Sequence, residues 1–385
     1  MQRFFRKITA RVVLLVNFLV ILFFLLASIT PYLNPGKWWF TGFLGLLFPY
    51  LLVVVLCFFI FWLIVSPRRS LYSLAAIIAG FSSIGKMLAL NKTEPFSLEK
   101  KEGQLRVMTW NVRYFVPFNV KIFKAEETNR DEILKEIRKF QPDVICFQEF
   151  FTNGDNKRDD NIRLISRELG YPYHFFSRDK VHWKTIITGM AIFSRYPMIQ
   201  SNLLTFPENI AKEAENTIST DIVIQGDTLR IFNIHLQSFR FMPRDYVDLG
   251  KIKNQQDSGL VASKNILRKM SSTFSLHGLQ ADFVTEKINQ SPFPVLLCGD
   301  MNDVPNSYAY RTLRGNRNDA FLEKGFGIGK TYTSATSRFL GKLPTLRIDY
   351  IFADPGIETT QFTQVNKKLS DHQALIADFK LMEKE

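Results

Sequence analysis

The first 90 residues of this 385-residue chain lack aspartate and glutamate altogether. Their charged side chains are all basic: Arg3, Arg6, Lys7, Arg11, Lys37, Arg68, Arg69 and Lys86. Of the formal net charge of +13, these residues contribute +8 and the remainder of the chain contributes +5. The remainder is therefore too weakly basic to indicate, by itself, a surface that binds a long polyanion.

Cysteine is scarce as well. The three cysteines, Cys57, Cys146 and Cys298, stand in apolar segments where small buried side chains are expected. Their number and positions favour neither a disulfide framework nor a cysteine-ligated metal cluster. The sequence also contains no internal repeat and no low-complexity tract.

Long apolar runs are concentrated before residue 91. Residues 12–30 and 38–65 are each long enough to cross a bilayer as a helix, which takes about 20 residues. Residues 70–90 contain serines and glycines that suit helix contacts in lipid, and they predict a third span. A cleaved signal peptide is the alternative for the first run, but that run exceeds the roughly 7 to 15 apolar residues of such a peptide. We therefore expect a membrane anchor of about three transmembrane helices.

Composition divides the chain into an anchor over residues 1–90, a polar linker over 91–104 and a folded domain over 105–385. The basic residues of the N-terminal tail and of Arg68-Arg69 predict that these two segments are cytoplasmic. Three spans would then place the folded domain outside the cytoplasm. The chain is expected to be an integral protein of the inner or plasma membrane.

The folded domain alternates short strand patterns with helical ones. The strand patterns are LRVMTWNV, DVICFQEF, YPYHFFS, GMAIFSRYPM, TISTDIVI, LRIFNIHL, FPVLLCG, RIDYIFA and QALIADF. Helical periodicity covers residues 126–140, 160–169 and 258–289. Gly226-Asp227 joins two strand patterns and predicts a hairpin, which argues against a purely parallel sheet. We expect an α/β fold with two packed sheets covered by helices.

Polar side chains gather where the apolar strands end. They are Asn111, Gln148, Glu149, Asn233, His235, Asp300, Asn302, Asp349, Asp371 and His372. Taken singly, most have a structural explanation, since GDMND is ordinary turn material and Asn306 or Ser307 could start a helix. Asp349 is harder to explain in this way, because it interrupts a strand that should be buried, and a buried carboxylate needs a partner such as histidine.

Together these groups supply what phosphoester hydrolysis requires. The oxygen ligands of Glu149, Asp371 and Asn111 suit Mg²⁺, with Mn²⁺ as the alternative metal, and such an ion polarises a phosphate. Asp300 can orient or deprotonate a water molecule, and Asn302 can hydrogen-bond a phosphoryl oxygen.

Two histidines complete the set. Asp349 behind His372 would fix the tautomer of the imidazole and favour the cation that stabilises phosphoryl charge. His235 could assist another phosphoryl oxygen or protonate the leaving group. The chemistry requires no covalent nucleophile.

From about Leu105 to Phe379 the chain resembles the endonuclease/exonuclease/phosphatase superfamily. These metal-dependent phosphodiesterases include DNase I, AP endonucleases, neutral sphingomyelinases, inositol-polyphosphate phosphatases and deadenylases. Six motifs match in the order of the family: TWNV, QE, NIHL, GDMN, RIDYIF and SDH. The resemblance implies a four-layer αββα sandwich of the DNase I type. It also implies roles for individual residues: a metal bound by Glu149 near Asn111 and Asp371, Asp300 as base or water-orienting group, Asn302 on the phosphate, and Asp349 paired with His372.

Two positions depart from the AP-endonuclease branch of the family. Arg113 stands where those enzymes have a carboxylate, and His235 is a histidine that they lack. The branch is therefore disfavoured, and Arg113 is either a contact to the substrate phosphate or a surface residue. His174, His182 and His277 match no motif and are expected to be structural.

The sequence thus predicts a membrane-anchored, Mg²⁺-dependent hydrolase of a phospholipid or another small phosphoester. A nuclease of the same superfamily is the first alternative, and an inactive membrane-tethered binding protein is the alternative from another class. The stretch SFRFMPR after His235 combines apolar and cationic side chains, as an interfacial loop would, and slightly favours a lipid substrate over nucleic acid. No protein partner is implied.

Overall fold

The computed structural model describes residues 2–92, 94–116, 128–156, 159–182, 184–212, 214–239, 241, 245, 259–333 and 346–381. Its helices are α1 Gln2–Ser28, α2 Thr41–Val65, α3 Pro67–Ala79, α4 Phe81–Met87, α5 Arg130–Phe140, α6 Asn161–Arg163, α7 Glu208–Ala211, α9 Gly259–Asn289, α10 Tyr308–Arg314 and α11 Ala320–Lys324. Its strands are β1 Ala89–Leu90, β2 Gln104–Asn111, β3 Val144–Asn153, β4 Tyr173–Phe176, β5 Lys180–His182, β6 Ile186–Ser194, β7 Met198–Leu204, β8 Thr217–Ile224, β9 Asp227–His235, β10 Val295–Asp300, β11 Asn318–Asp319, β12 Phe326–Gly327, β13 Asp349–Ala353, β14 Ile357–Gln364 and β15 Leu375–Leu381. Short turns of helix are η1 Thr30–Tyr32, η2 Arg113–Phe115 and the π-helical η4 Leu164–Glu168.

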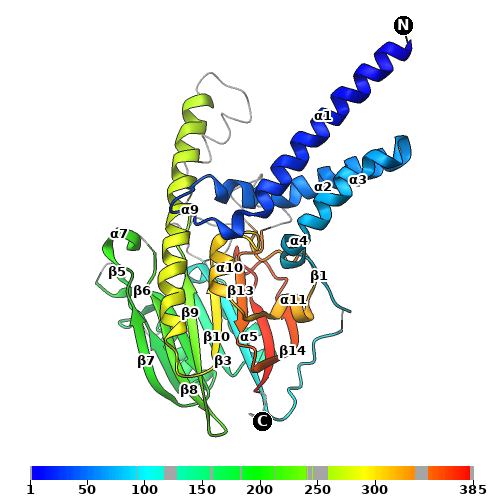
Figure 1. The fold of residues 1–385 in the computed structure, drawn as a ribbon. Helices are drawn as coiled ribbons and strands as arrows, with labels where there is room; N and C mark the ends of the chain where they lie inside the picture. The colour runs from blue at the N-terminus through cyan, green and yellow to red at the C-terminus, as the bar shows by residue number, and fades with distance from the viewer. Residues whose placement is uncertain are drawn as a thin grey trace.

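Two mixed sheets form the centre of the domain (Figure 1). One has the order β14-β15-β2-β3-β6-β4, with β5 also paired to β6, and the other has the order β11-β13-β10-β9-β8-β7. Apolar side chains from both sheets, including Cys146 and Cys298, pack together in a core between them. A second core joins α5 to the outer face of the first sheet, and a third joins α9 and α10 to the outer face of the second. The predicted four-layer αββα sandwich is confirmed.

The predicted hairpin is the pair β8 and β9, which run antiparallel. Ile224 pairs with Asp227, so the two-residue loop is Gln225-Gly226 and begins one residue earlier than predicted. Both loop residues have positive φ, at 53° and 96°, as the favoured two-residue hairpin turn requires.

The N-terminal helices differ from the prediction in one respect. Ile8–Tyr32 and Thr41–Val65 are long and apolar enough to cross a membrane. The predicted span over residues 70–90 is not continuous, because α3 and α4 meet at an angle of 59° around Gly80 and count as one span only if taken together. The Cα of Gly80 packs on Phe24, where a Cβ atom would lie 2.5 Å from the ring. The predicted number of about three spans is therefore close, but the third is broken.

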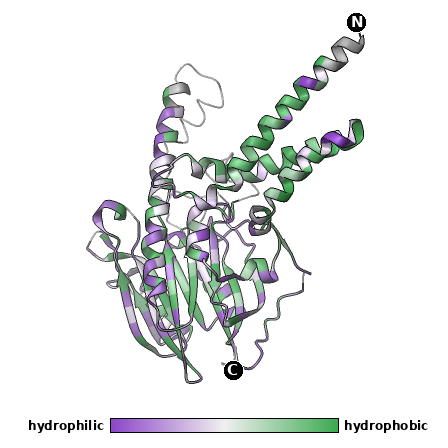
Figure 2. Cartoon of the chain, in the orientation of Figure 1, coloured by the Kyte–Doolittle hydropathy of each residue, from purple (hydrophilic) through white to green (hydrophobic). Residues whose placement is uncertain are grey.

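Figure 2 shows that α1, α2 and α3 are hydrophobic along most of their length, whereas the domain surface is mixed. The residues between α1 and α2, which we call the α1–α2 connection (residues 29–40), lie at the end of these helices that meets the domain (Figure 1). The described residues of the predicted linker, 91–92 and 94–104, run along the domain and contact it. Asn91 donates to Leu322 O and Gly325 O, and Lys100 pairs with Asp143.

Candidate active site

The site residues lie where several strands end at one edge of the paired sheets. β2 and β3 are parallel, and Asn111, the last residue of β2, pairs with Gln148 of β3. β9 and β10 are also parallel, and Asp300 pairs with His235. Asp300 pairs on its other side with Asp349, the first residue of β13. The topology therefore gathers polar residues that are far apart in the sequence.

Asp300 is fully buried at the centre of the site. Its Oδ2 lies 3.6 Å from His235 Nε2 and 3.6 Å from His372 Nε2, and it accepts a hydrogen bond from Asn111 Nδ2 at 3.1 Å. Its Oδ1 accepts a hydrogen bond from the backbone N–H of Asn302 at 2.8 Å. The carboxylate is thus held from both sides while one oxygen faces two imidazoles.

His372 has the predicted carboxylate partner. Its Nδ1 lies 3.0 and 3.1 Å from the two carboxylate oxygens of Asp349, which leaves Nε2 directed to Asp300. Burial lowers the pKa of His372, but the charges of Asp349 and Asp300 more than offset this and raise the pKa well above its ordinary value. The structure therefore favours an imidazolium at this position.

His235 has an equivalent partner that the sequence interpretation missed. Its Nδ1 lies 2.8 Å from Glu215 Oε2, which also accepts a hydrogen bond from the backbone N–H of Glu149 at 3.2 Å. Burial lowers the pKa of His235, but the hydrogen bond and charge of Glu215, together with Asp300 and Glu149, raise it to about 9. The β8–β9 hairpin offered a signal, because Ile218 pairs with Asn233 and the hairpin thus brings the chain before β8 towards the end of β9, where His235 lies.

Glu149 projects into the site from a bulge in β3. The register of β3 against β6 shifts between Phe147 and Phe150, and Glu149 has φ of 49°. Such bulges redirect a side chain at a sheet edge. Glu149 Oε1 lies 3.4 Å from Asn111 Nδ2 and 4.0 Å from His235 Nε2.

Arg113 and Asp371 form the rim of the site. Arg113 Nε lies 3.5 Å from Asp371 Oδ2, and the Arg113 side chain is 11% exposed. Arg113, Tyr114 and Phe115 all have positive φ, at 48°, 55° and 58°, which non-glycine residues rarely adopt in succession. Of the two interpretations left open for Arg113, the surface residue is wrong. Contact with a substrate phosphate stays a prediction.

Asn302 lies at the inner side of the same edge with φ of 50°. Its Nδ2 donates one hydrogen bond to Leu236 O at 3.0 Å. An amide group carries two donor hydrogens, so one remains for a phosphoryl oxygen. Its role on the phosphate also stays a prediction.

The donor groups of the site fit a divalent cation. Among the described residues, Asp300, Asp349 and His372 have ligand atoms within 4.8 Å of one another. That group is already internally paired, because His372 bonds to Asp349. The predicted ligands Glu149, Asn111 and Asp371 offer oxygen donors instead, which Mg²⁺ prefers.

The charge around Glu149 supports Glu149, Asn111 and Asp371 as the metal ligands. Burial raises the pKa of Glu149, His235 lowers it, and the neighbouring carboxylates of Glu215 and Asp371 raise it again, with a net upward shift. Asn111 Oδ1 accepts a hydrogen bond from Arg113 N at 3.1 Å and keeps a second lone pair. A cation near Glu149 would relieve the crowding of carboxylates.

Other polar residues at the strand ends have structural roles. Gln148 Nε2 donates to Asn233 Oδ1 at 2.6 Å, and this hydrogen bond joins the two sheets. His277 is buried and donates from Nε2 to Gln237 O at 2.7 Å, in agreement with its expected structural role. In the SFRFMPR stretch, Arg240, Met242 and Arg244 lie outside the described residues, and the two phenylalanines Phe239 and Phe241 stack on each other.

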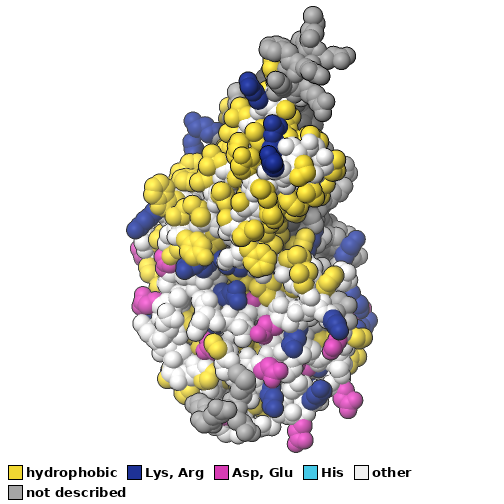
Figure 3. All heavy atoms as spheres, turned by 45° about the vertical axis from the view of Figure 1, so that its right-hand side comes forward, with side chains coloured by type: hydrophobic (Ala, Val, Ile, Leu, Met, Phe, Trp, Pro, Cys, Tyr) yellow, Lys and Arg dark blue, Asp and Glu magenta, His cyan; other side chains and the backbone are white. Residues whose placement is uncertain are grey.

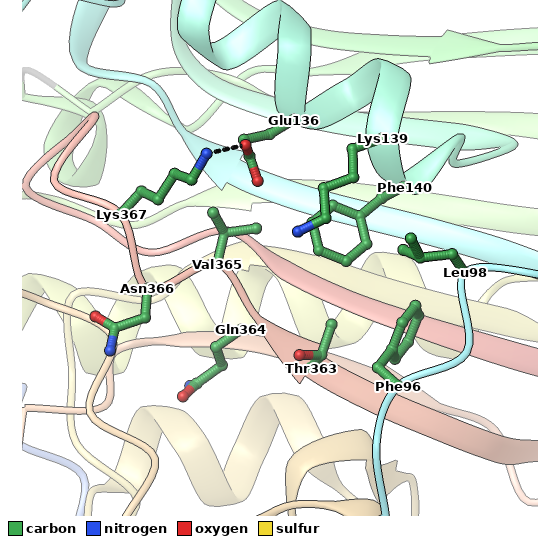
Figure 4. Close-up of a pocket in the computed structure, with 10 residues that line it drawn as sticks. All are labelled: Phe96, Leu98, Glu136, Lys139, Phe140, Thr363, Gln364, Val365, Asn366 and Lys367. Carbon is green, nitrogen blue, oxygen red and sulfur yellow. Dashed lines mark hydrogen bonds and ion pairs between the residues drawn. The ribbon is translucent and has the colours of Figure 1, made fainter.

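A separate pocket of about 370 Å³ lies away from these residues (Figure 4). It is lined by Phe96, Leu98, Glu136, Lys139, Phe140, Thr363, Gln364, Val365, Asn366 and Lys367. Lys367 and Glu136 form an ion pair across it. None of the site residues described above lines this pocket, so we assign it no part in the chemistry.

Residues 108–372 match a family model described as the endonuclease/exonuclease/phosphatase family, and residues 10–87 match one described as a domain of unknown function. No curated protein matches the chain. Among solved structures, an endonuclease/exonuclease/phosphatase from Beutenbergia cavernae is similar, with 21% identity, a TM-score of 0.52 and coverage of 73% of this chain and 72% of that one. The human Nocturnin catalytic domain, with bound sulfate, has 18% identity, a TM-score of 0.50 and coverage of 73% and 95%. TDP2 from D. rerio, in complex with a single-strand DNA product, has 16% identity, a TM-score of 0.50 and coverage of 72% and 100%.

Proposed function

Because the chain belongs to the endonuclease/exonuclease/phosphatase family, we propose that it is a membrane-anchored, Mg²⁺-dependent hydrolase of phosphoesters. The observation that carries this proposal is the position of Asp300. One of its oxygens lies 3.6 Å from Nε2 of both His235 and His372, and each histidine has a carboxylate on its other nitrogen. A buried base between two cationic donors suits attack of water on a phosphate.

In the proposed mechanism, Glu149, with Asn111 and Asp371 nearby, holds the metal. When bound, the ion supplies positive charge to the phosphate oxygens and polarises the phosphorus centre. Mn²⁺ is the alternative metal for the same oxygen donors. Asp300 orients the attacking water and accepts its proton.

The remaining groups stabilise charge and the leaving group. The oxygen of water bonds to phosphorus while the bond from phosphorus to the leaving oxygen breaks, and His235 donates a proton to that oxygen. His372, held by Asp349, donates a hydrogen bond to a phosphoryl oxygen, and the second amide hydrogen of Asn302 does the same. The products are an alcohol and a phosphate with one ester bond fewer.

We propose a phospholipid or another small phosphoester as the substrate. The weak net charge of the domain supports this choice, since a long polyanion is usually bound by a strongly basic surface. A nuclease is the rival, and the likeness to D. rerio TDP2 with its single-strand DNA product supports the shared fold alone. The inactive tethered binding protein is the weakest alternative, because every predicted catalytic and metal residue is present.

The proposed organisation is an anchor over residues 1–90, a linker over 91–104 and a catalytic domain over 105–385. Two apolar helices near the N-terminus are long enough to span a membrane. Arg68 and Arg69 stand at the start of α3, and the basic N-terminal tail starts α1, so both lie at helix ends remote from the α1–α2 connection. By the positive-inside rule, this arrangement supports an extracytoplasmic catalytic domain.

A substrate panel tests the function. The purified full chain in detergent would be given phospholipids, a chromogenic phosphodiester, a phosphomonoester, plasmid DNA and RNA, each with Mg²⁺ and with chelator. We expect Mg²⁺-dependent hydrolysis of the lipid or the small esters. Turnover of nucleic acid alone would establish the nuclease, and no turnover of any substrate would favour the binding protein.

A further inference from the structure

The α1–α2 connection docks on the loop that leaves the active site. Thr30 Oγ1 lies 3.0 Å from Asn306 O, and Asn306 Nδ2 donates to Ala27 O at 2.8 Å. Asn306 follows Asn302 by four residues in the same loop. The membrane helices therefore contact the catalytic loop itself and not a remote part of the domain.

The packing at this contact is close enough to require glycine. A Cβ atom on Gly45 of α2 would lie 2.6 Å from the backbone oxygen of Asn306. A Cβ atom on Gly42 would lie 2.2 Å from the ring of Phe274 in α9. A Cβ atom essentially never lies this close to a non-bonded heavy atom, so α2 fits the domain surface in this position because Gly42 and Gly45 lack side chains.

The chain just before β13, the strand that begins with the site residue Asp349, also contacts the anchor. Arg347, two residues before Asp349, donates from Nη2 to Lys86 O in α4 at 2.8 Å. Arg347 is fully buried, and its Nη1 pairs with Asp319 at 2.6 Å. The edge of the sandwich that carries the active site is thus the edge that meets the membrane helices (Figure 1).

Two exposed tryptophans lie in the α1–α2 connection, at this edge of the domain. Trp38 and Trp39 in the α1–α2 connection are 52% and 50% exposed. Tryptophan concentrates where the acyl chains meet the head groups. Figure 3 shows the apolar surface of the anchor as a continuous region that gives way to mixed charge on the domain. With the apolar helices in a bilayer, this arrangement would bring the active-site edge beside the head-group layer.

The first half of α9 extends past the connection. Phe274 of α9 packs on Phe43 at the start of α2, with ring centroids 5.2 Å apart, and α9 begins fifteen residues earlier, at Gly259. That half exposes Leu267 together with Lys264 and Arg268, which are four residues apart and share a helix face. Apolar and cationic side chains on one helix face suit contact with an anionic lipid surface.

We propose that the enzyme takes its substrate in cis, as a phosphoester head group from the same membrane that holds its anchor. The inference rests on the proposed hydrolase function and adds to it the location and class of the substrate. Water attacks the phosphorus of a lipid phosphodiester, and the bond to one of its two alcohols breaks. The released alcohol takes the proton from His235, and the other product is a phosphomonoester.

Vesicle populations that differ only in their protein content test the proposal. The full chain is reconstituted into vesicles of phosphatidylethanolamine, phosphatidylglycerol and cardiolipin with one isotopic label. Protein-free vesicles of the same composition with a second label are then added with Mg²⁺. We expect labelled product almost entirely from the vesicles that contain the protein. Equal product from both populations would overturn action in cis.

Charge reversal on α9 gives an independent readout. The double variant Lys264→Glu, Arg268→Glu, reconstituted into the same anionic vesicles, should hydrolyse the lipid of its own vesicles several-fold more slowly, because each basic residue near the surface contributes to attraction of the bilayer. Its kcat and KM for a soluble chromogenic phosphodiester should match the unmodified chain. Lys287→Glu, at the opposite end of α9, is the control. It should not alter the hydrolysis of either substrate. An unchanged rate of hydrolysis of the surrounding anionic lipid by the reconstituted double variant would contradict the proposed contact.

The soluble phosphodiester separates this inference from the function on which it rests. Hydrolysis of the soluble ester without hydrolysis of any lipid would overturn the proposal of a lipid substrate. The proposed hydrolase function would still stand. No hydrolysis of either the soluble ester or the lipid would contradict the proposed hydrolase function itself. Degradation of plasmid DNA or RNA with intact vesicles would replace the lipid with nucleic acid.

Discussion

Asp300 and Glu149 have different surroundings, which suit the different roles proposed for them. Asp300 is fully buried, and its Oδ2 lies 3.6 Å from each of two imidazole nitrogens. Glu149 lies on a β-bulge among carboxylates, where a cation would be stabilised. The first position suits activation of water, and the second suits metal binding.

We predict that Glu149→Gln and Asp300→Asn lose activity for different reasons. Glu149→Gln should weaken Mg²⁺ binding, because a neutral amide replaces the charged ligand. Asp300→Asn should bind Mg²⁺ normally but turn over about 10² to 10⁴ times more slowly, as expected for loss of a general base. Calorimetric titration with Mg²⁺ and steady-state kinetics would be measured on both variants. Near-normal turnover by Asp300→Asn would refute its assignment.

Glu215 is predicted to control the protonation of His235. The pKa of His235, raised to about 9, should fall in Glu215→Gln because the hydrogen bond and charge that raise it are lost. The contribution of this pair to stability is present below about pH 6.5 and is lost as pH rises through about 9. NMR titration of the imidazole in chelator measures the shift, with Glu208→Gln on exposed α7 as the control. An unchanged pKa in Glu215→Gln would show that the pair does not act as described.

Sequence motifs indicated most of the residues that the structure gathers at the site, but not all of the side chains that hydrogen-bond to them. The pairing of Asp349 with His372 was predicted because a carboxylate in a buried strand needs a partner, and the two residues do pair. Glu215 was missed because it stands in a charged stretch before β8 and belongs to no motif. The left-handed turn at Arg113 could not be predicted either, since nothing in its local sequence requires positive φ.

At the scale of elements, the contact between α2 and the catalytic loop can be tested at glycine. Gly45→Ala should destabilise the protein by about 1 to 3 kcal/mol, because the new Cβ atom would overlap the backbone oxygen of Asn306. Gly85→Ala in α4 is the matched control, since a Cβ atom there has nothing within 4 Å. Thermal unfolding in detergent measures both variants. Equal melting temperatures would show that the anchor does not pack on the loop.

Elements with strong periodicity were predicted well, whereas the edge strands β7 and β14 were missed and irregular elements were not predicted. The nine strand patterns and the helix over 258–289 have counterparts in the structure. The hairpin loop was placed one residue too late, because Gly226 can occupy either position of the turn. The third span was predicted as continuous, since its composition does not reveal the bend at Gly80, where close packing on Phe24 accompanies a change of helix direction.

At the scale of the whole molecule, the distribution of basic residues supports the proposed orientation in the membrane. The basic residues at the start of α1 and of α3 lie at the helix ends remote from the α1–α2 connection, which docks on the domain. We predict that a reporter fused after Glu385 behaves as an exported protein, and that a reporter fused after Arg69 behaves as a cytoplasmic one. Alkaline phosphatase and fluorescent-protein fusions would be compared. Cytoplasmic behaviour of both fusions would show that α3 and α4 do not cross together.

We propose that this fold performs metal-dependent phosphoester hydrolysis. The most direct measurement is hydrolysis of a soluble chromogenic phosphodiester by the full chain with Mg²⁺, with EDTA, and with Mg²⁺ restored in excess, alongside Asp300→Asn. We predict turnover that stops in EDTA, returns when Mg²⁺ is restored, and is nearly lost in Asp300→Asn under every condition. Full activity in EDTA, or equal activity of Asp300→Asn and the unmodified chain, would contradict the claim.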